Sequence, residues 1–211
     1  MLIKGIKETL YMTLWSTALA YALGLPLGVI LVATDRGGLR PMRGLNAALG
    51  IIINIARSIP FLILLIAVIP LTRAIVGRMV GSTATIVPLT LSAAPFIARL
   101  VESSLKEVDA GVVQAARSMG ASPMQIICKV LLPEARPSLL LGAAIAITTI
   151  LGYSAMAGIV GGGGLGDIAI RYGYYRYQRD TMLITVALLV LIVQAFQEVG
   201  ARAAKRIDRR I

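Results

Sequence analysis

Long runs of apolar residues with almost no charge dominate this sequence. The first covers residues 9–34 and lies between Glu8 and Asp35. A helix needs about 20 apolar residues to cross the hydrocarbon core of a bilayer, so this run is long enough to span it with some tilt. Four further runs have the same character, at residues 45–71, 79–98, 137–166 and 181–197. We therefore expect an all-α integral membrane protein with five transmembrane helices.

The charges are few and mostly positive. Only 15% of the 211 residues are charged, and 21 Lys and Arg outnumber 10 Asp and Glu, for a net charge of +11. Such a balance could indicate nucleic acid, but aromatic residues make up only 5% and the charges lie between apolar runs, which argues against a nucleic-acid partner. If the chain crosses the membrane five times, thirteen basic residues lie on the membrane face that holds the C-terminus and seven on the face that holds the N-terminus. Because cytoplasmic loops carry the excess of Lys and Arg, we expect a cytoplasmic C-terminus and an N-terminus outside.

The sequence lacks the residues that metal binding, hydrolytic catalysis and nucleotide binding usually require. The chain has no His and one cysteine, Cys128, which disfavours zinc sites, Ser-His-Asp triads and an intrachain disulfide. Gly161, Gly163 and Gly166 fit a dinucleotide-binding pattern, but they end an apolar span instead of joining a strand to a helix. No P-loop motif occurs either. We expect no catalytic residue, metal or cofactor in this chain, and any energy source must be another chain.

The polar segment 99–136, between the third and fourth spans, predicts two short helices. Asp109 is a suitable N-cap for the first, and Gly120 is placed to stop it. Ser122 and Gln125 form a capping box for a second helix, which should start at Pro123 and break before Pro133. The first helix carries one apolar stripe, which could lie on the bilayer, fold back on the spans or be covered by a partner. The stripe consists of Val112, Ala115, Ala116 and Met119.

This segment resembles the EAA loop of permease subunits of ABC importers. Gln114-Ala115-Ala116 is followed by Gly120 and then by Leu132-Pro133 at the spacing of that motif. Gln114 stands where the motif has Glu, which removes a charge but keeps a hydrogen-bonding amide. Further segments are similar to the methionine importer permease: RSIPF at 57–61, IVPLT at 86–90, AAPFIAR at 93–99, GASPMQI at 120–126, GYSAM at 152–156 and GGGGLG at 161–166.

The resemblance implies a single ABC transmembrane domain over residues 1–211, with the type I importer permease fold. It implies that Gln114, Ala115, Ala116, Met119 and Gly120 belong to a cytoplasmic coupling helix that docks on an ATPase subunit. The implied machine has two permease copies, two ATPase subunits that hold ATP and Mg, and an extracytoplasmic methionine-binding protein. It would sit among the lipids of the bacterial inner membrane and import L- or D-methionine by alternating access. An importer of a polar amino acid or betaine, and a channel or scaffold without an ATPase, remain alternatives.

Three residues are candidates for the translocation path. Arg57 falls within the second span, where a charged side chain costs roughly 3 kcal/mol or more unless it finds a partner or water. It could pair with Glu102 or Asp167, line a cavity or meet a substrate carboxylate; alternatively the span begins later and leaves Arg57 at the headgroups. Tyr153 and Met156 lie among small residues in the fourth span, which suits either a substrate path or ordinary helix packing.

Overall fold

The computed structural model describes residues 1–207, and every regular element within them is a helix. Arg209 and Arg210, two of the basic residues assigned to the cytoplasmic side, lie outside the described residues. Short π-helical or 3-10 segments (η1, η2 and η3) connect some of the α-helices. The elements are α1 Leu2–Thr34, α2 Arg43–Ser58, α3 Phe61–Ala67, α4 Ile69–Val76, α5 Ser82–Lys106, α6 Ala110–Ser118, α7 Pro123–Ile126, η1 Ile127–Leu131, α8 Leu132–Glu134, α9 Arg136–Met156, η2 Ala157–Val160, α10 Gly164–Ile168, η3 Ala169–Tyr174 and α11 Arg179–Ile207.

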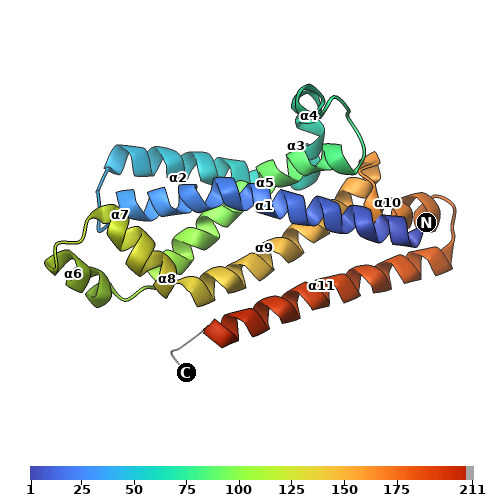
Figure 1. Cartoon of the computed structure of the whole chain (residues 1–211). Helices are drawn as coiled ribbons and strands as arrows, with labels where there is room; N and C mark the ends of the chain where they lie inside the picture. Colours follow the sequence, from blue (N-terminus) through green and yellow to red (C-terminus); the bar gives the residue numbers. More distant parts are fainter. Residues whose placement is uncertain (208–211) are drawn as a thin grey trace.

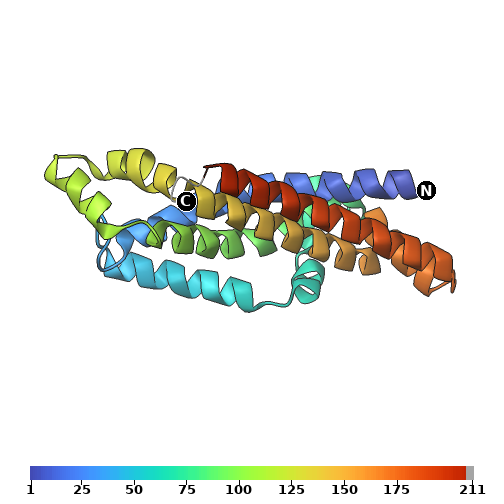
Figure 2. The same cartoon turned by 90° about the horizontal axis from the view of Figure 1, so that it is seen from below.

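The long helices form an elongated bundle. α1, α5, α9 and α11 run along its length, with the N-terminus at one end and α6 at the other (Figures 1 and 2). Among the described residues, four helical segments are long and apolar enough to cross a membrane, or five if the bent pair α2–α3 counts as one span. The prediction of an all-α membrane protein is confirmed, and its five predicted spans are reached when α2–α3 counts as one.

α1 and α5 pack against each other through glycine. A Cβ atom on Gly24 would come within 2.7 Å of the Ala94 carbonyl oxygen, and one on Gly28 within 2.6 Å of the Ala98 carbonyl oxygen. No side chain fits in that space, so the two backbones approach more closely than larger residues would allow. This pair is the rigid centre of the bundle.

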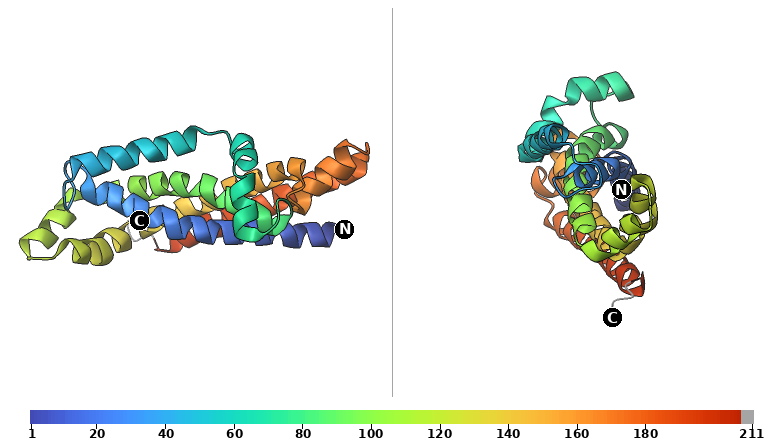
Figure 3. Two further views of the ribbon diagram at one scale, coloured as in Figure 1. Left: turned by 90° about the horizontal axis from the view of Figure 1, so that it is seen from above. Right: turned by 90° about the vertical axis from the view of Figure 1, so that its left-hand side faces the viewer.

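The second predicted span is not one helix. α2 ends at Ser58 and α3 starts at Phe61, with a bend of 98° between them. Pro60 causes the break because it lacks an N–H and disfavours the helical conformation in the residue before it, and Ile59 is indeed extended (φ −78°, ψ 121°). Figure 3 shows α2 along the bundle and the α3–α4 segment turned away from it.

Other helices end at different residues from those predicted. α5 continues beyond residue 98 to Lys106, so Arg99 and Glu102 lie on a membrane-spanning helix and not in the loop. α9 ends at Met156, and the rest of the fourth predicted span is a 3-10 turn followed by glycines, of which Gly161 has φ +77°. The predicted break before Pro133 is wrong: the π-helical segment η1 lets the chain continue as α8 through Pro133.

Candidate functional site

α6 begins and ends where its sequence predicts. The Asp109 carboxylate accepts hydrogen bonds from the backbone N–H groups of Gly111 (2.7 Å) and Val112 (3.3 Å), which makes it the N-cap. At the other end, the N–H groups of Gly120 and Ala121 donate to carbonyls of the last turn, as in a Schellman motif. Gly120 has φ +79°, a conformation that favours glycine. These caps define α6 without any partner.

The predicted apolar stripe of α6 is divided between two faces. Ala116 is only 5% exposed and belongs to the hydrophobic core, so the chain itself covers this part of the stripe, as in the alternative in which the stripe folds back on the spans. Val112 is 44% exposed and Met119 80% exposed, and Ala115 is exposed beside them. Since Ala116 holds α6 to the chain, the uncovered residues form the face that a partner could reach.

α6 and α7 together form a projection at one end of the molecule (Figures 1 and 2). The predicted capping box of α7 is confirmed, because the N–H of Gln125 donates to the Ser122 hydroxyl and the N–H of Ser122 donates to the Gln125 side chain. Gln114 is exposed and lines a cavity of about 200 Å³ between α6 and the turn at residues 37–39. The Arg117 guanidinium donates to the Gly38 carbonyl at 2.8 Å, which ties the projection to that turn.

An ion-pair network lies at the base of the projection. The Lys106 ammonium is 2.8 Å from a carboxylate oxygen of Asp35 and 2.9 Å from one of Glu102. The hydrogen bond from Lys106, together with one from the backbone N–H of Arg36, lowers the pKa of the Asp35 carboxyl below its ordinary value. The network therefore joins the end of α1 to the end of α5, next to the turn that holds Arg117.

Arg99 extends this network to α2. Its guanidinium donates to Glu102 at 2.6 Å, to the Asn54 side chain at 2.8 Å and to the Gly50 carbonyl at 3.2 Å. α2 buries only Ile53, so these polar bonds are a large part of what holds it against α5. The sequence analysis missed Arg99 and Asn54 because their partnership depends on which helices are neighbours.

The candidate partners of Arg57 are engaged elsewhere. Glu102 pairs with Arg99 and Lys106, and Asp167 pairs with Arg171 at 3.1 Å, so the predicted pairing of Arg57 with either acid is wrong. Arg57 is exposed and makes no hydrogen bond or ion pair within residues 1–207.

The register of α2 places Arg57 about half way along the length of the bundle. Asn46, near the start of α2, donates to the Leu31 carbonyl at 2.7 Å, so these residues lie at one level. Arg57 is eleven residues further along α2, or about 16 Å at the rise of an α-helix. The same distance along the antiparallel α1 reaches about residue 20, near the middle of Leu2–Thr34 (Figure 1). This depth argues against the alternative in which Arg57 lies at the headgroups.

The break in the second span brings the three path candidates into one region. The rings of Phe61 and Tyr153 stack with their centroids 4.7 Å apart and their planes 6° from parallel. Met156 lies one helical turn beyond Tyr153 and is 43% exposed. Arg57 precedes Phe61 by four residues. Phe61 was missed as a candidate, although its place directly after Pro60 could have indicated that it begins a new helix at the break.

The glycine-rich turn after α9 is bound to α1 and α5. The backbone N–H of Gly164 donates to the Glu8 carboxylate and that of Leu165 to the Thr9 hydroxyl, each at 2.9 Å. The Thr85 hydroxyl donates to the Gly162 carbonyl at 3.3 Å. These bonds fix the turn at the end of the bundle that holds the N-terminus. Within residues 1–207, no three His, Cys, Asp or Glu residues cluster as a metal site would require.

Residues 24–211 match a family model described as binding-protein-dependent transport system inner membrane component. The chain is 53% identical, over 210 residues, to the probable D-methionine transport system permease protein MetI of Vibrio cholerae, covering 100% of this chain and 93% of that protein. It is 51% identical over 158 residues to the D-methionine transport system permease protein MetI of Escherichia coli K12, covering 75% of this chain and 73% of that one.

Solved structures agree with these sequence relationships. A chain of the methionine ABC transporter MetNI, in an inward-facing conformation, is 48% identical and superposes with a TM-score of 0.97 over 99% of this chain and 96% of that one. A chain of an amino acid ABC transporter shares the fold, with a TM-score of 0.79 at 20% identity over 97% of this chain and 93% of that one. The chain belongs to the family of binding-protein-dependent transport system inner membrane components.

Proposed function

We propose that this chain is the permease subunit of an ATP-driven importer that carries methionine, in its L form, D form or both, across the bacterial inner membrane. The observation that carries this proposal is the 53% identity, along the entire chain, to a relative named as a D-methionine permease. The superposition on a chain of the methionine transporter MetNI supports it. The permease does no covalent chemistry, and ATP with Mg acts on a partner ATPase.

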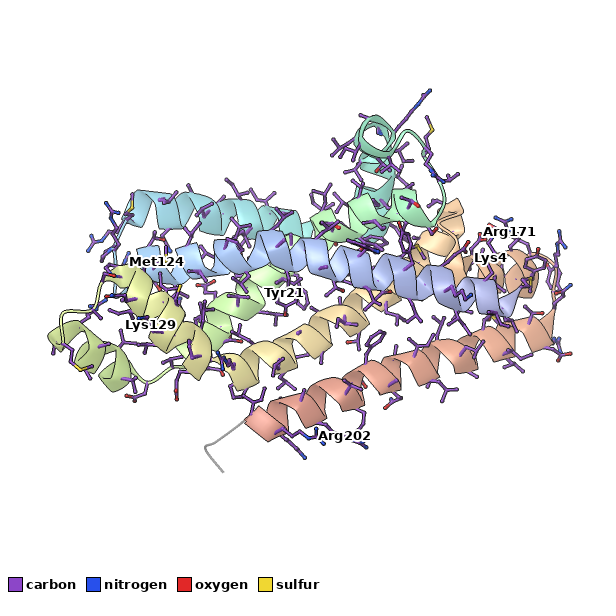
Figure 4. The ribbon with its side chains drawn as sticks, in the orientation of Figure 1. Lys4, Tyr21, Met124, Lys129, Arg171 and Arg202 are labelled. Atoms are coloured by element: carbon purple, nitrogen blue, oxygen red, sulfur yellow. The ribbon has the colours of Figure 1, made fainter. Side chains whose placement is uncertain are left out.

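Two copies of the chain and two ATPase subunits form the working assembly, and an extracytoplasmic binding protein delivers methionine. The N-terminus faces outside and the C-terminus the cytoplasm, in accordance with the excess of basic residues on the C-terminal side. Figure 4 illustrates the two ends, with Lys4 and Arg171 near one and Met124 and Lys129 near the other. The α6 projection then points into the cytoplasm, toward the ATPase.

The exposed face of α6 docks in a groove of the ATPase. Ala115 is small enough for close approach, while Val112 and Met119 supply apolar surface beside it. Gln114 and Gly120 lie at the edges of this contact, and Ala116 supports it from within the chain. The ion pairs between Asp35, Lys106 and Glu102 link the base of α6 to the spans, so a displacement of α6 would reach α5 and α2.

The translocation path runs past the break of the second span. Arg57, Tyr153 and Met156 line it, and a second copy of the chain closes its other side. ATP drives the assembly between inward-open and outward-open states because nucleotide binds one state more tightly than the other.

Reconstitution tests the proposed function directly. The permease is placed in liposomes with its candidate ATPase and binding protein, and uptake of radiolabelled methionine is measured with and without ATP. We expect ATP-dependent methionine uptake. Uptake of only a different solute, such as a polar amino acid or betaine, would overturn the methionine assignment. Solute flux that needs no ATPase would instead support a channel.

The docking face is tested by Ala115→Trp. We expect this bulky residue to abolish methionine-stimulated ATP hydrolysis without changing the stability of the permease, since Ala115 is exposed. Ala187→Trp, at an exposed alanine of α11, is the matched control and should retain stimulation. Normal stimulation in Ala115→Trp would contradict docking through this face.

The path is tested by Met156→Ala. We expect slower methionine uptake with unchanged basal ATP hydrolysis, because the half-exposed thioether would lose its contact with the passing side chain. If both uptake and ligand binding match the wild type, Met156 does not line the path.

A further inference from the structure

Arg57 presents a full positive charge half way along the bundle, and no residue within 1–207 pairs with it. Its position at the C-terminal end of α2 gives it a favourable interaction with the partial negative charge of the helix end. That interaction offsets only part of the cost of a guanidinium at this depth. Arginine within a membrane span usually faces a partner or a water-filled cavity. Arg57 therefore requires a partner anion or water at this depth, and the described residues supply no anion.

The acidic residues of the described chain are either paired or far from Arg57 along the bundle. Glu102 and Asp35 bind Lys106, Asp167 binds Arg171, and Glu8 accepts from Gly164 at the outer end. The remaining acids lie in the α5–α6 turn, in α8 and in α11. A carboxylate that passes along the proposed path would supply the anion that these residues do not.

An apolar platform follows this charge along the chain. Phe61 is four positions after Arg57, so their Cα atoms are no more than about 14 Å apart even if the chain were extended. Phe61 stacks on Tyr153, and the exposed Met156 follows one turn later. Aromatic rings and a thioether make favourable contacts with a sulfur-containing or other apolar side chain. Charge and platform together match the two ends of an apolar α-amino acid.

We infer that Arg57 binds the α-carboxylate of the transported amino acid while Phe61, Tyr153 and Met156 contact its side chain. This inference rests on the proposed function and assigns the path a substrate subsite. The guanidinium fork suits a carboxylate because it donates two parallel hydrogen bonds. The pair is strong where water is excluded and weakens when the path opens and water enters. Such a site would hold the substrate in transit and release it on opening.

The first test measures carboxylate recognition in the purified permease–ATPase complex, without nucleotide or binding protein. Radiolabelled L-methionine is displaced by unlabelled L-methionine or by L-methioninamide, in which the carboxylate is replaced by a neutral amide. We expect the amide to compete about tenfold more weakly or worse on the wild type, since charge-assisted hydrogen bonds are lost. In Arg57→Gln, the two competitors should become nearly equal. Arg43→Gln, at the other end of α2, is the matched control and should discriminate like the wild type.

The second test needs no variant. Phenylglyoxal modifies accessible arginines, and peptide mass spectrometry reports the modification of Arg57 in the wild-type complex. We expect methionine to protect Arg57 from modification and methioninamide to protect it at least several-fold less. Equal protection by the two compounds, or none by methionine, would overturn the inference.

The outcomes separate this inference from the proposed function. A wild-type complex that imports methionine, while Arg57→Gln still discriminates against the amide, overturns the role of Arg57 alone. A wild-type complex that imports no methionine overturns the proposed function. Assembly with the ATPase and basal ATP hydrolysis verify that Arg57→Gln is folded. If it fails to assemble, the protection of wild-type Arg57 decides the question.

Discussion

α1–α5 and α2–α3 are both apolar enough to belong to membrane spans, but the two pairs are packed differently. α1 and α5 meet through Gly24 and Gly28 and bury much of their facing surfaces. α2 buries only Ile53 and depends on polar bonds from Arg99 and Asn46 to stay in place. The first pair is a scaffold, while the second is a loosely packed wall that carries an unpaired charge. Apolar content alone does not distinguish a scaffold from a path.

The largest expected effect comes from filling the space between α1 and α5. Gly28→Leu would drive a side chain into the Ala98 carbonyl and Val101, and we expect it to destabilise the permease by about 3 kcal/mol. The melting temperature of the complex in detergent measures this loss. Gly44→Leu, in α2, is the control because no atom lies within 4 Å of its Cβ position. If both variants melt alike, close packing of α1 on α5 is not the scaffold.

A smaller loss of stability is expected where polar bonds hold α2 against α5. Glu102→Gln removes the carboxylate shared by Arg99 and Lys106, with Glu102 only 12% exposed, and should cost about 2 kcal/mol. Thermal melting would measure the loss of stability, and the rate of proteolysis within α2 would show whether the loss is located there. Glu198→Gln breaks a pair with the same 2.6 Å distance in an exposed setting and should cost about 0.5 kcal/mol or less. Equal costs would mean that burial of the network adds nothing.

The stack at the break should contribute less to stability than to transport. Phe61→Leu keeps an apolar side chain but removes the ring contact with Tyr153, and we expect a loss of about 1 kcal/mol. Methionine uptake should fall more than the melting temperature suggests, because the platform beside Arg57 is altered. Phe196→Leu, in α11, provides a control for the change of side chain. Unchanged uptake in Phe61→Leu would remove the stack from the path.

The smallest effect concerns pH at the base of α6. The pKa of Asp35 is lowered in the folded protein, so its ion pair stabilises the fold above the ordinary carboxyl pKa of 3.8. This stability is lost as the pH falls below that value and through the lowered pKa, because the carboxyl then takes up a proton. Melting curves between about pH 6 and pH 3 should show a smaller decrease for Asp35→Asn than for the wild type. Parallel curves would contradict a stabilising Asp35–Lys106 pair.

Local features of the site were predictable from the sequence, whereas its pairings were not. Asp109, Gly120 and the Ser122–Gln125 capping box act through residues at most a few positions away, so spacing alone predicts them. Arg57 was recognised as unusual, but the two acids offered among its alternatives, Glu102 and Asp167, pair with Arg99 and Arg171 instead. The sequence also left open whether Ala116 faces the spans or a partner, since a helical stripe does not reveal which part of it the chain itself covers.

The sequence by itself determined that this chain is a helical membrane protein, because helices in a bilayer must satisfy their own backbone bonds and be apolar for about 20 residues. It also determined the caps of α6, which depend on neighbours in the chain. Only the tertiary structure decided that the second span is bent by 98°, that Arg57 lies at mid-depth and that Phe61 meets Tyr153. These facts depend on how helices distant in the sequence pack side by side, and hydropathy does not encode that choice.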